Sequence, residues 1–238
     1  LGFKIKFLIQ IIACIIVVVI FDIRINFIPN YLLSVILSIL WIIGLSNAFN
    51  IIDIMDGLSS GIALIASLFF FFIALPSEMI YVNFCAIALV GGCLGFLPYN
   101  LSERKKIFMG DTGSLSIGFI LAAVSMGTSY TQVNIIGVVA PVLILAVPIY
   151  ETLFVSVMRM KKGKNPFLGS KDHFPLRLEK IGYKRRQILV FVYSACAVLG
   201  ISAYLTVNLS EPFAFIPFAS IFIVLVFFAV KLSKIKVD

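Results

Sequence analysis

Apolar blocks of about 20 residues dominate this sequence and limit what it can fold into. Hydrophobic residues make up 61% of the 238 residues, and charged residues only 13%. A soluble domain has roughly half its residues apolar and about a quarter charged, so too little polar surface remains here to face water. A block of this length crosses the hydrocarbon core of a bilayer as one helix. We therefore expect an integral membrane protein.

Lipid offers the backbone no hydrogen-bond partners, so each block is predicted to be an α-helix. The sequence predicts a single all-α domain over residues 1–238, a polytopic transmembrane helical bundle of about eight spans. The polar residues concentrate between the spans, above all in a loop at about 158–187. The predicted spans are residues 7–25, 31–49, 58–75, 79–98, 113–130, 135–157, 188–207 and 213–231.

The basic residues predict the orientation of the bundle. If the N-terminus is cytoplasmic and the spans alternate, 18 of the 19 Lys and Arg residues lie on the cytoplasmic side, and only Arg24 does not. Cytoplasmic loops of membrane proteins carry such an excess of Lys and Arg. The net charge of +8 is therefore explained by topology, and we expect no nucleic-acid partner.

A first polar cluster begins at the end of the second predicted span and continues beyond it. Its members recur at every third position, and they are Asn47, Asn50, Asp53 and Asp56. In a helix, neighbouring members of such a series lie above one another on one face. The alternative is a solvated helix end with capping Asp and Asn side chains. Capping explains one or two of these residues but not four in register, so we expect a functional site.

A second cluster, residues 105–114, precedes the fifth predicted span. Gly110 and Gly113 flank Asp111, and glycines let a backbone approach a ligand closely. The amides that open the following helix favour an anion. Asp111 is therefore placed to hold Mg²⁺ that bridges to phosphate oxygens. Phe108 is placed to stack on a nucleotide base, and anchoring at the membrane interface is its alternative interpretation.

A third cluster begins at Glu151 and continues through the loop after the sixth span. Its lysines are explained by the positive-inside bias alone. His173 and Arg177 are four residues apart, so a short helix would bring them together to hold a pyrophosphate or a sugar. The three clusters together suit an anionic nucleotide, held through Mg²⁺ beside a lipid phosphate.

These clusters resemble the motifs of a known family. Residues 47–58 resemble Asn-Ala-x-Asn-x-x-Asp-Gly-x-Asp-Gly-Leu, with Ile54 at the first glycine, and residues 108–115 resemble Phe-Met-Gly-Asp-x-Gly-Ser-Leu. Residues 148–167 follow Pro-x-x-Asp-Thr…Arg…Gly-x-x-Pro-Phe, with Glu151 in place of Asp. The family is that of the polyprenyl-phosphate N-acetylhexosamine-1-phosphate transferases. It includes the enzymes that start lipid-linked peptidoglycan, O-antigen and teichoic acid synthesis.

The resemblance implies a role for each matching residue. It implies catalytic roles for Asp53, Asp56 and Asp111, and Mg²⁺ binding, with Mn²⁺ as an alternative ion, by Asp111 and Asp53. Phe108 matches an aromatic residue that stacks on uracil. The substrate-binding residues implied in this way are Asn47, Asn50, Lys106, Phe108, Gly110, Arg159, His173 and Arg177.

The resemblance also implies a reaction, its partners and its location. The expected enzyme is a Mg²⁺-dependent transferase in the bacterial cytoplasmic membrane, with its active face toward the cytoplasm. It would move N-acetylglucosamine-1-phosphate from a UDP-amino sugar to undecaprenyl phosphate. This is the first membrane step of cell-wall or surface polysaccharide synthesis, including that of lipopolysaccharide O-antigen. The oligomeric state stays open, with a homodimer as one option.

Two departures from the family keep alternatives open. Pro175 and Leu176 stand where the family has the later histidines of a His-x-His-His-Arg stretch. The family's Asp-Asp pair, expected in a loop before Leu1, is absent from the sequence. We therefore expect an N-terminally truncated fragment, or a non-catalytic relative that binds lipid-linked sugars. A secondary transporter is less favoured, because it would place ionisable residues near the bilayer midplane within paired repeats.

Overall fold

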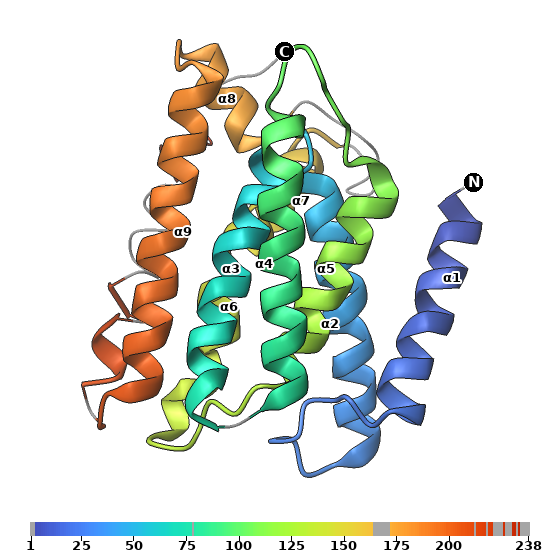
Figure 1. Ribbon diagram of the computed structural model, residues 1–238, viewed down its shortest axis with the longest axis vertical. Coiled ribbons are helices and arrows are strands. Elements are labelled where there is room, and N and C mark those ends of the chain that lie inside the picture. Colours follow the sequence, from blue (N-terminus) through green and yellow to red (C-terminus); the bar gives the residue numbers. More distant parts are fainter. Residues whose placement is uncertain are drawn as a thin grey trace.

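The computed structural model describes residues 3–77, 79–163 and 172–211 and single stretches between 213 and 233. Every regular element in these residues is helical, which confirms the predicted all-α class. Most of the longer helices run along the long axis of the molecule as a bundle (Figure 1). The α-helices are α1 (Phe3–Ile15), α2 (Tyr31–Ile52), α3 (Leu58–Ala74), α4 (Ile80–Asn100), α5 (Gly110–Gly127), α6 (Ala140–Ile144), α7 (Ala146–Lys161), α8 (Phe174–Lys180) and α9 (Arg185–Asn208).

Four described helical stretches are long and apolar enough to cross a membrane. They are α2, α3 with its 3₁₀ extension to Ser77, α4 and α9. A fifth is formed if the bent stretch from Ile135 to Lys161 counts as one broken span. The predicted number of about eight stays a prediction, since about half of span 213–231 lies outside the described residues. α1 and α5, which correspond to the predicted spans 7–25 and 113–130, are not among these stretches. α1 has 13 residues before a π-helical turn, and α5 opens on polar residues.

The predicted span 135–157 is broken rather than straight. A 3₁₀ turn (Ile135–Val139) leads into α6, and the helices on either side of Leu145 differ in direction by 67°. Pro148 lies in the first turn of α7. A proline has no N–H to donate, and its ring clashes with the carbonyl four residues earlier, here that of Ile144. The helix therefore breaks just before Pro148 and restarts as α7.

Two helices form the centre of the bundle. α2 packs against α1, α5 and α7, while α3 packs against α4, α5 and α9. Phe49 of α2 and Phe70 of α3 are fully buried, whereas Leu32, Tyr81 and Phe84 are more than half exposed. Large apolar side chains on the outside suit contact with lipid, as expected for a bundle that is apolar on both surfaces. The buried centre fixes the ends of α2, α3 and α5 relative to one another.

Candidate functional site

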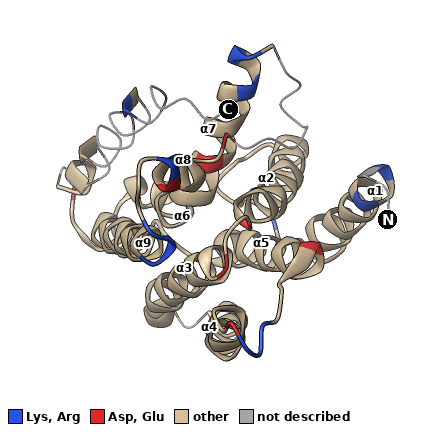
Figure 2. Ribbon diagram, turned by 90° about the horizontal axis from the view of Figure 1, so that it is seen from above, with Lys and Arg blue, Asp and Glu red and all other residues tan. Residues whose placement is uncertain are grey.

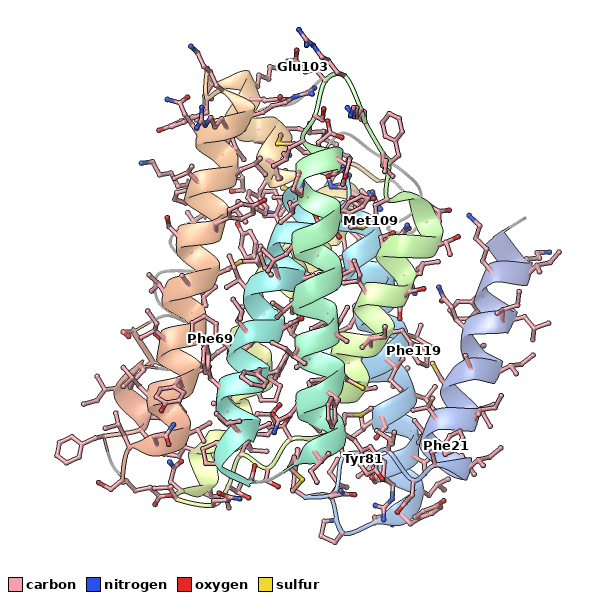
Figure 3. All side chains as sticks on the ribbon, in the orientation of Figure 1. Phe21, Phe69, Tyr81, Glu103, Met109 and Phe119 are labelled. Atoms are coloured by element: carbon pink, nitrogen blue, oxygen red, sulfur yellow. The ribbon has the colours of Figure 1, made fainter. Side chains whose placement is uncertain are left out.

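The polar connections gather at one end of the bundle. The N-terminus of α1, the α2–α3 turn, the α4–α5 loop and α8 lie at the upper end in Figure 1, and Figure 2 looks down on this end. Figure 3 places Glu103 and Met109 toward this end, and Phe21 and Tyr81 at the other. Charged residues from distant parts of the sequence therefore share one end of the molecule.

The α2–α3 turn carries the first of the predicted acidic residues. α2 ends at Ile52, Asp53 follows as its C-cap, and α3 starts after Gly57. The predicted helical register therefore holds through Asn50 but not to Asp56, which lies in the turn. Gly57 has a φ of +80°, a conformation that favours glycine. This conformation lets the chain reverse within a few residues and keeps Asp53 and Asp56 on the same polar end.

Asp111 lies in the first turn of α5, where two other helices reach it. Lys6 of α1 forms an ion pair with its Oδ2, and Asn50 Nδ2 donates to its Oδ1 at 3.1 Å. Asn50 also donates to Ser114 Oγ at 3.1 Å. Gly110 has a φ of +62°, and the space where a Cβ would lie is open. The structure thus brings Asn50 and Asp111 together, and it leaves the backbone at Gly110 accessible.

Lys106 and Phe108 of the α4–α5 loop lie beside the α2–α3 turn. Lys106 Nζ donates to Asp56 Oδ2 at 2.6 Å. The same ammonium lies 5.0 Å from the centroid of the Phe108 ring. The Phe108 side chain is largely exposed, with 72% of the residue accessible. An exposed ring beside a cation is available for stacking. Stacking on a nucleotide base and anchoring at the membrane interface therefore both stay open for Phe108.

The three carboxylates influence one another's protonation. Burial first, and then the negative charges of Asp56 and Asp111, together raise the pKa of Asp53 to about 6. The pKa of Asp111 is instead lowered, first by its hydrogen bond with Lys6 and then by that with Asn50. We call Asp53, Asp56 and Asp111 the acidic cluster. Within the described residues, Asp53 is its one member with no ion pair to a lysine.

Two side chains from other helices hold the turn in place. Asn100 Oδ1 accepts from the Gly57 N–H at 2.6 Å, and Asn100 Nδ2 donates to the Ile107 carbonyl at 2.9 Å. Tyr193 of α9 donates its hydroxyl to the Gly57 carbonyl at 2.5 Å. A Cβ on Gly61 would lie 2.2 Å from the Tyr193 ring. Asn100 therefore ties the α2–α3 turn to the α4–α5 loop, and glycine at position 61 makes room for Tyr193.

A second charged group joins α7 to α8, and we call it the α7–α8 cluster. Glu151 Oε1 lies 2.7 Å from His173 Nδ1, and its Oε2 accepts from the Phe174 N–H at 3.2 Å. Arg177 Nη2 donates to Asp172 Oδ1 at 3.1 Å. The members of this cluster are Glu151, Lys162, Asp172, His173 and Arg177.

The predicted sugar-binding residues are buried. His173 caps the N-terminus of α8 and is 6% exposed, Arg177 is 0% exposed, and Arg159 is 5% exposed. The predicted short helix does bring His173 and Arg177 together, since the Arg177 N–H donates to the His173 carbonyl at 3.1 Å. Their side chains, however, are held by Glu151 and Asp172. In this arrangement they support α8, and the predicted motif residues 164–167 lie outside the described residues.

The acidic cluster fits a divalent cation that is shared with phosphate. No three His, Cys, Asp or Glu side chains of the described residues gather closely enough to hold a metal unaided. Mg²⁺ is bound in proteins by one or two carboxylates together with substrate phosphates and water. Asp53 and Asp111 interact electrostatically, and neither is fully buried. They therefore match a site whose remaining ligands are water molecules, which substrate phosphates replace in part when the substrate binds.

Several residues at this end were not predicted from the sequence. Asn47 donates to Gln10 Oε1 at 3.2 Å, so α1 contributes both Gln10 and Lys6 to the site. Lys6 and Gln10 are four residues apart and thus share one face of a helix, which is a signal present in the sequence. Asn100 and Tyr193 carry no such signal, since their importance depends on contacts with Gly57.

The helices and their charged end define a class of protein. It is a helical membrane protein whose carboxylates, amides, lysines and exposed aromatic ring meet at one end of the bundle. Residues 1–129, more than half of the chain, match the sequence profile of glycosyl transferase family 4. The chain belongs to this family.

Relatives with assigned names agree with this membership. A probable undecaprenyl-phosphate N-acetylglucosaminyl 1-phosphate transferase of Bacillus subtilis is 34% identical over 167 residues, which are 70% of this chain and 46% of the relative. A decaprenyl-phosphate N-acetylglucosaminephosphotransferase of Mycobacterium tuberculosis is 31% identical over 189 residues, covering 71% and 46%. A phospho-N-acetylmuramoyl-pentapeptide-transferase of Listeria welshimeri is 49% identical over 92 residues, covering 39% and 28%. The chain spans about half the length of the first two relatives.

Proposed function

We propose that this protein transfers N-acetylglucosamine-1-phosphate from its UDP-sugar to undecaprenyl phosphate. The observation that carries the proposal is the convergence of Asp53, Asp56 and Asp111 at one end of the bundle, with Asn50 and Lys106 bonded to them. An anionic nucleotide and a lipid phosphate both need cations, donors and a metal-binding carboxylate at the membrane surface. The names of the relatives support the same donor sugar and a polyprenyl acceptor.

The reaction joins two phosphates. An oxygen of the lipid phosphate forms a bond to the β-phosphorus of the UDP-sugar, and the bond from that phosphorus to the bridging oxygen breaks. UMP leaves with the bridging oxygen, and the product is a polyprenyl-diphospho-sugar. Lys106 would neutralise phosphate charge, and Phe108 would stack on the uracil. Asp53, for which the described part of the chain shows no lysine partner, would accept a proton from the lipid phosphate or attack the β-phosphorus itself.

Mg²⁺ would be held by Asp111 and Asp53 and would supply neutralisation of the charge that develops on the phosphate oxygens. Asn50 would fix the Asp111 carboxylate through the 3.1 Å hydrogen bond it already makes. The protein's own contribution is therefore to orient two carboxylates from two different helices.

The α7–α8 cluster would place the loop that meets the sugar. We expect His173 to act through the position of α8, because its ring is turned toward Glu151. His173→Ala should then weaken use of the sugar nucleotide more than use of the lipid. The polar end would face the cytoplasm of a bacterial cell, since most of the described lysines and arginines lie in the start of α1, the α4–α5 loop, the C-terminal end of α7, α8 and the start of α9.

Membranes that contain the full-length gene product test the proposal directly. They would receive radiolabelled UDP-N-acetylglucosamine, undecaprenyl phosphate and Mg²⁺, with and without EDTA. We expect label in the organic phase only when Mg²⁺ is present. No transfer from this or any other UDP-amino sugar would instead support a non-catalytic relative, for which Pro175 and Leu176 in place of histidines would be the reason.

An exchange assay distinguishes the two proposed roles of Asp53, which are proton acceptor and nucleophile. Labelled UMP is incubated with UDP-N-acetylglucosamine and protein in the absence of lipid. Appearance of label in the UDP-sugar requires a phosphosugar held on the protein, which supports attack by Asp53. Exchange that needs the lipid acceptor supports direct attack by the lipid phosphate.

A further inference from the structure

Lys6 is the one described residue of α1 that reaches the acidic cluster with a charge. It lies in the second turn of α1 and pairs with Asp111, which is 105 residues away in the sequence. The side chains of Lys6 and Asp111 are 37% and 55% exposed, so the pair is open to solvent. One turn further along the same face, Gln10 accepts from Asn47 at 3.2 Å and holds α1 against α2.

Among the described residues, two lysines pair with the three carboxylates of the acidic cluster. Lys106 pairs with Asp56, Lys6 pairs with Asp111, and Asp53 has neither. Asp111 is also bonded to Asn50, so its two oxygens are occupied by Lys6 and Asn50. A divalent cation that binds Asp111 must therefore approach a carboxylate that already carries an ammonium group. Two cations at one carboxylate repel each other, so the Lys6 side chain must leave the metal-binding oxygen.

The destination of a displaced lysine follows from its chemistry. The ammonium group is a strongly hydrated point charge on a flexible stem of four carbons, and it binds phosphate readily. The only large anions that the proposed reaction brings to this end are the phosphates of the nucleotide and of the lipid. A lysine that moves from Asp111 to such a phosphate remains paired with a negative charge. It also adds one positive charge beside the substrate.

We propose that Lys6 is an exchangeable counter-cation: it neutralises Asp111 in the empty site and moves to a substrate phosphate when a divalent cation binds Asp111. The proposal rests on the proposed function for the identity of the phosphate. The competition between Lys6 and the cation depends only on the geometry at Asp111.

Lys4 provides a matched control on the same helix. It is exposed and makes no ion pair or hydrogen bond in the part of the chain that the structure describes. Two residues correspond to about 200° of rotation around an α-helix, so Lys4 lies on nearly the opposite side of α1 from Lys6. Removing either lysine changes the net charge equally, and only the loss of Lys6 frees Asp111.

The first measurement is the affinity of the purified full-length protein for Mn²⁺ alone. Electron paramagnetic resonance of the ion measures this binding. Lys6→Ala should bind Mn²⁺ about tenfold more tightly than wild type, because the competing charge is gone. Lys4→Ala and Lys6→Arg should bind it as wild type does. Unchanged or weaker binding by Lys6→Ala, or no Mn²⁺ binding by any variant, would overturn the proposal.

The second measurement tests the phosphate half. UDP binding in the presence of saturating Mn²⁺ should weaken about tenfold in Lys6→Ala and stay unchanged in Lys4→Ala. Equal UDP binding by wild type and Lys6→Ala would show that Lys6 does not move to a phosphate. If Mn²⁺ and UDP behave as expected but no sugar phosphate reaches the lipid, the proposed transfer fails while the role of Lys6 stands.

Discussion

The acidic cluster and the α7–α8 cluster lie toward the same end of the bundle but use their charges differently. In the acidic cluster, Asp111 is 55% exposed and its partners come from α1 and α2. In the α7–α8 cluster, Glu151 and Arg177 have side-chain exposures of 0% and 1%. Exposed ion pairs contribute at most about 1 kcal/mol, so a ligand can replace either partner. A buried pair that loses one member leaves a costly unpaired charge, so it acts as fixed support.

The sharpest test of this difference is Asp111→Asn. We expect transfer to fall at least about 100-fold, because the metal loses a charged ligand. The unfolding temperature should barely change, since an exposed pair adds little stability. The radiolabel assay and thermal unfolding measure the two effects. Asp22→Asn is the control, because Asp22 forms an exposed ion pair with Arg24 in the α1–α2 connection at the opposite end. Near-normal turnover of Asp111→Asn would remove the metal assignment.

Glu151→Gln should show the reverse pattern. Loss of the carboxylate weakens the contacts to His173 and the Phe174 N–H, and we expect a loss of about 1–3 kcal/mol in stability. Mn²⁺ binding should remain as in wild type. Trp41, the one tryptophan, reports unfolding by fluorescence. Glu179→Gln removes the exposed ion pair with Arg185 and should change the midpoint of unfolding far less. Equal shifts of the unfolding midpoint in both variants would contradict the view that the buried α7–α8 cluster supports the fold more than an exposed ion pair does.

Tyr193→Phe tests the contact between α9 and the acidic turn. It removes only the hydroxyl that donates to the Gly57 carbonyl. A neutral hydrogen bond is worth about 1 kcal/mol, so we expect turnover to fall about fivefold as the turn loosens. The Michaelis constant of the UDP-sugar should change less than turnover. Tyr204→Phe on the same helix is the matched control, and an identical effect there would contradict a specific role for Tyr193.

The smallest expected effect is a pH dependence of stability in metal-free protein. The pKa of Asp53 is raised to about 6, above the value near 3.9 of an unfolded aspartate. Between these values the folded state binds more protons than the unfolded state. The contribution of Asp53 to stability therefore grows as the pH falls through 6 and is lost as the pH rises.

Thermal unfolding in EDTA at pH 7 and pH 5 measures this contribution. Relative to Asp53→Asn, wild type should gain on the order of 1–2 °C on acidification, since Asp53 is only half-buried. A difference between the two proteins that does not change with pH would show that burial and the neighbouring carboxylates do not raise the pKa of Asp53.

The α7–α8 cluster shows best where sequence reasoning stops. The spacing of His173 and Arg177 correctly predicted that one short helix brings them together. It gave no sign that Glu151, 22 residues earlier, would face the His173 ring. That contact depends on the break before Pro148, which sets the direction of α7.

Apolar block length by itself determined the helical class and the ends of α2, α3, α4 and α9 to within a few residues. Motif spacing predicted that Asn47, Asn50, Asp53 and Asp56 lie together, and the predicted topology placed Asp111 on the same side of the membrane. Both are local properties, since a backbone in lipid must bond within its own segment and side chains three or four apart share a face. Only the tertiary structure decided which lysine pairs with which carboxylate, and that Asn100 and Tyr193 hold Gly57. Such contacts join residues 43 to 136 positions apart, and packing between helices, not periodicity along any one of them, brings these residues together.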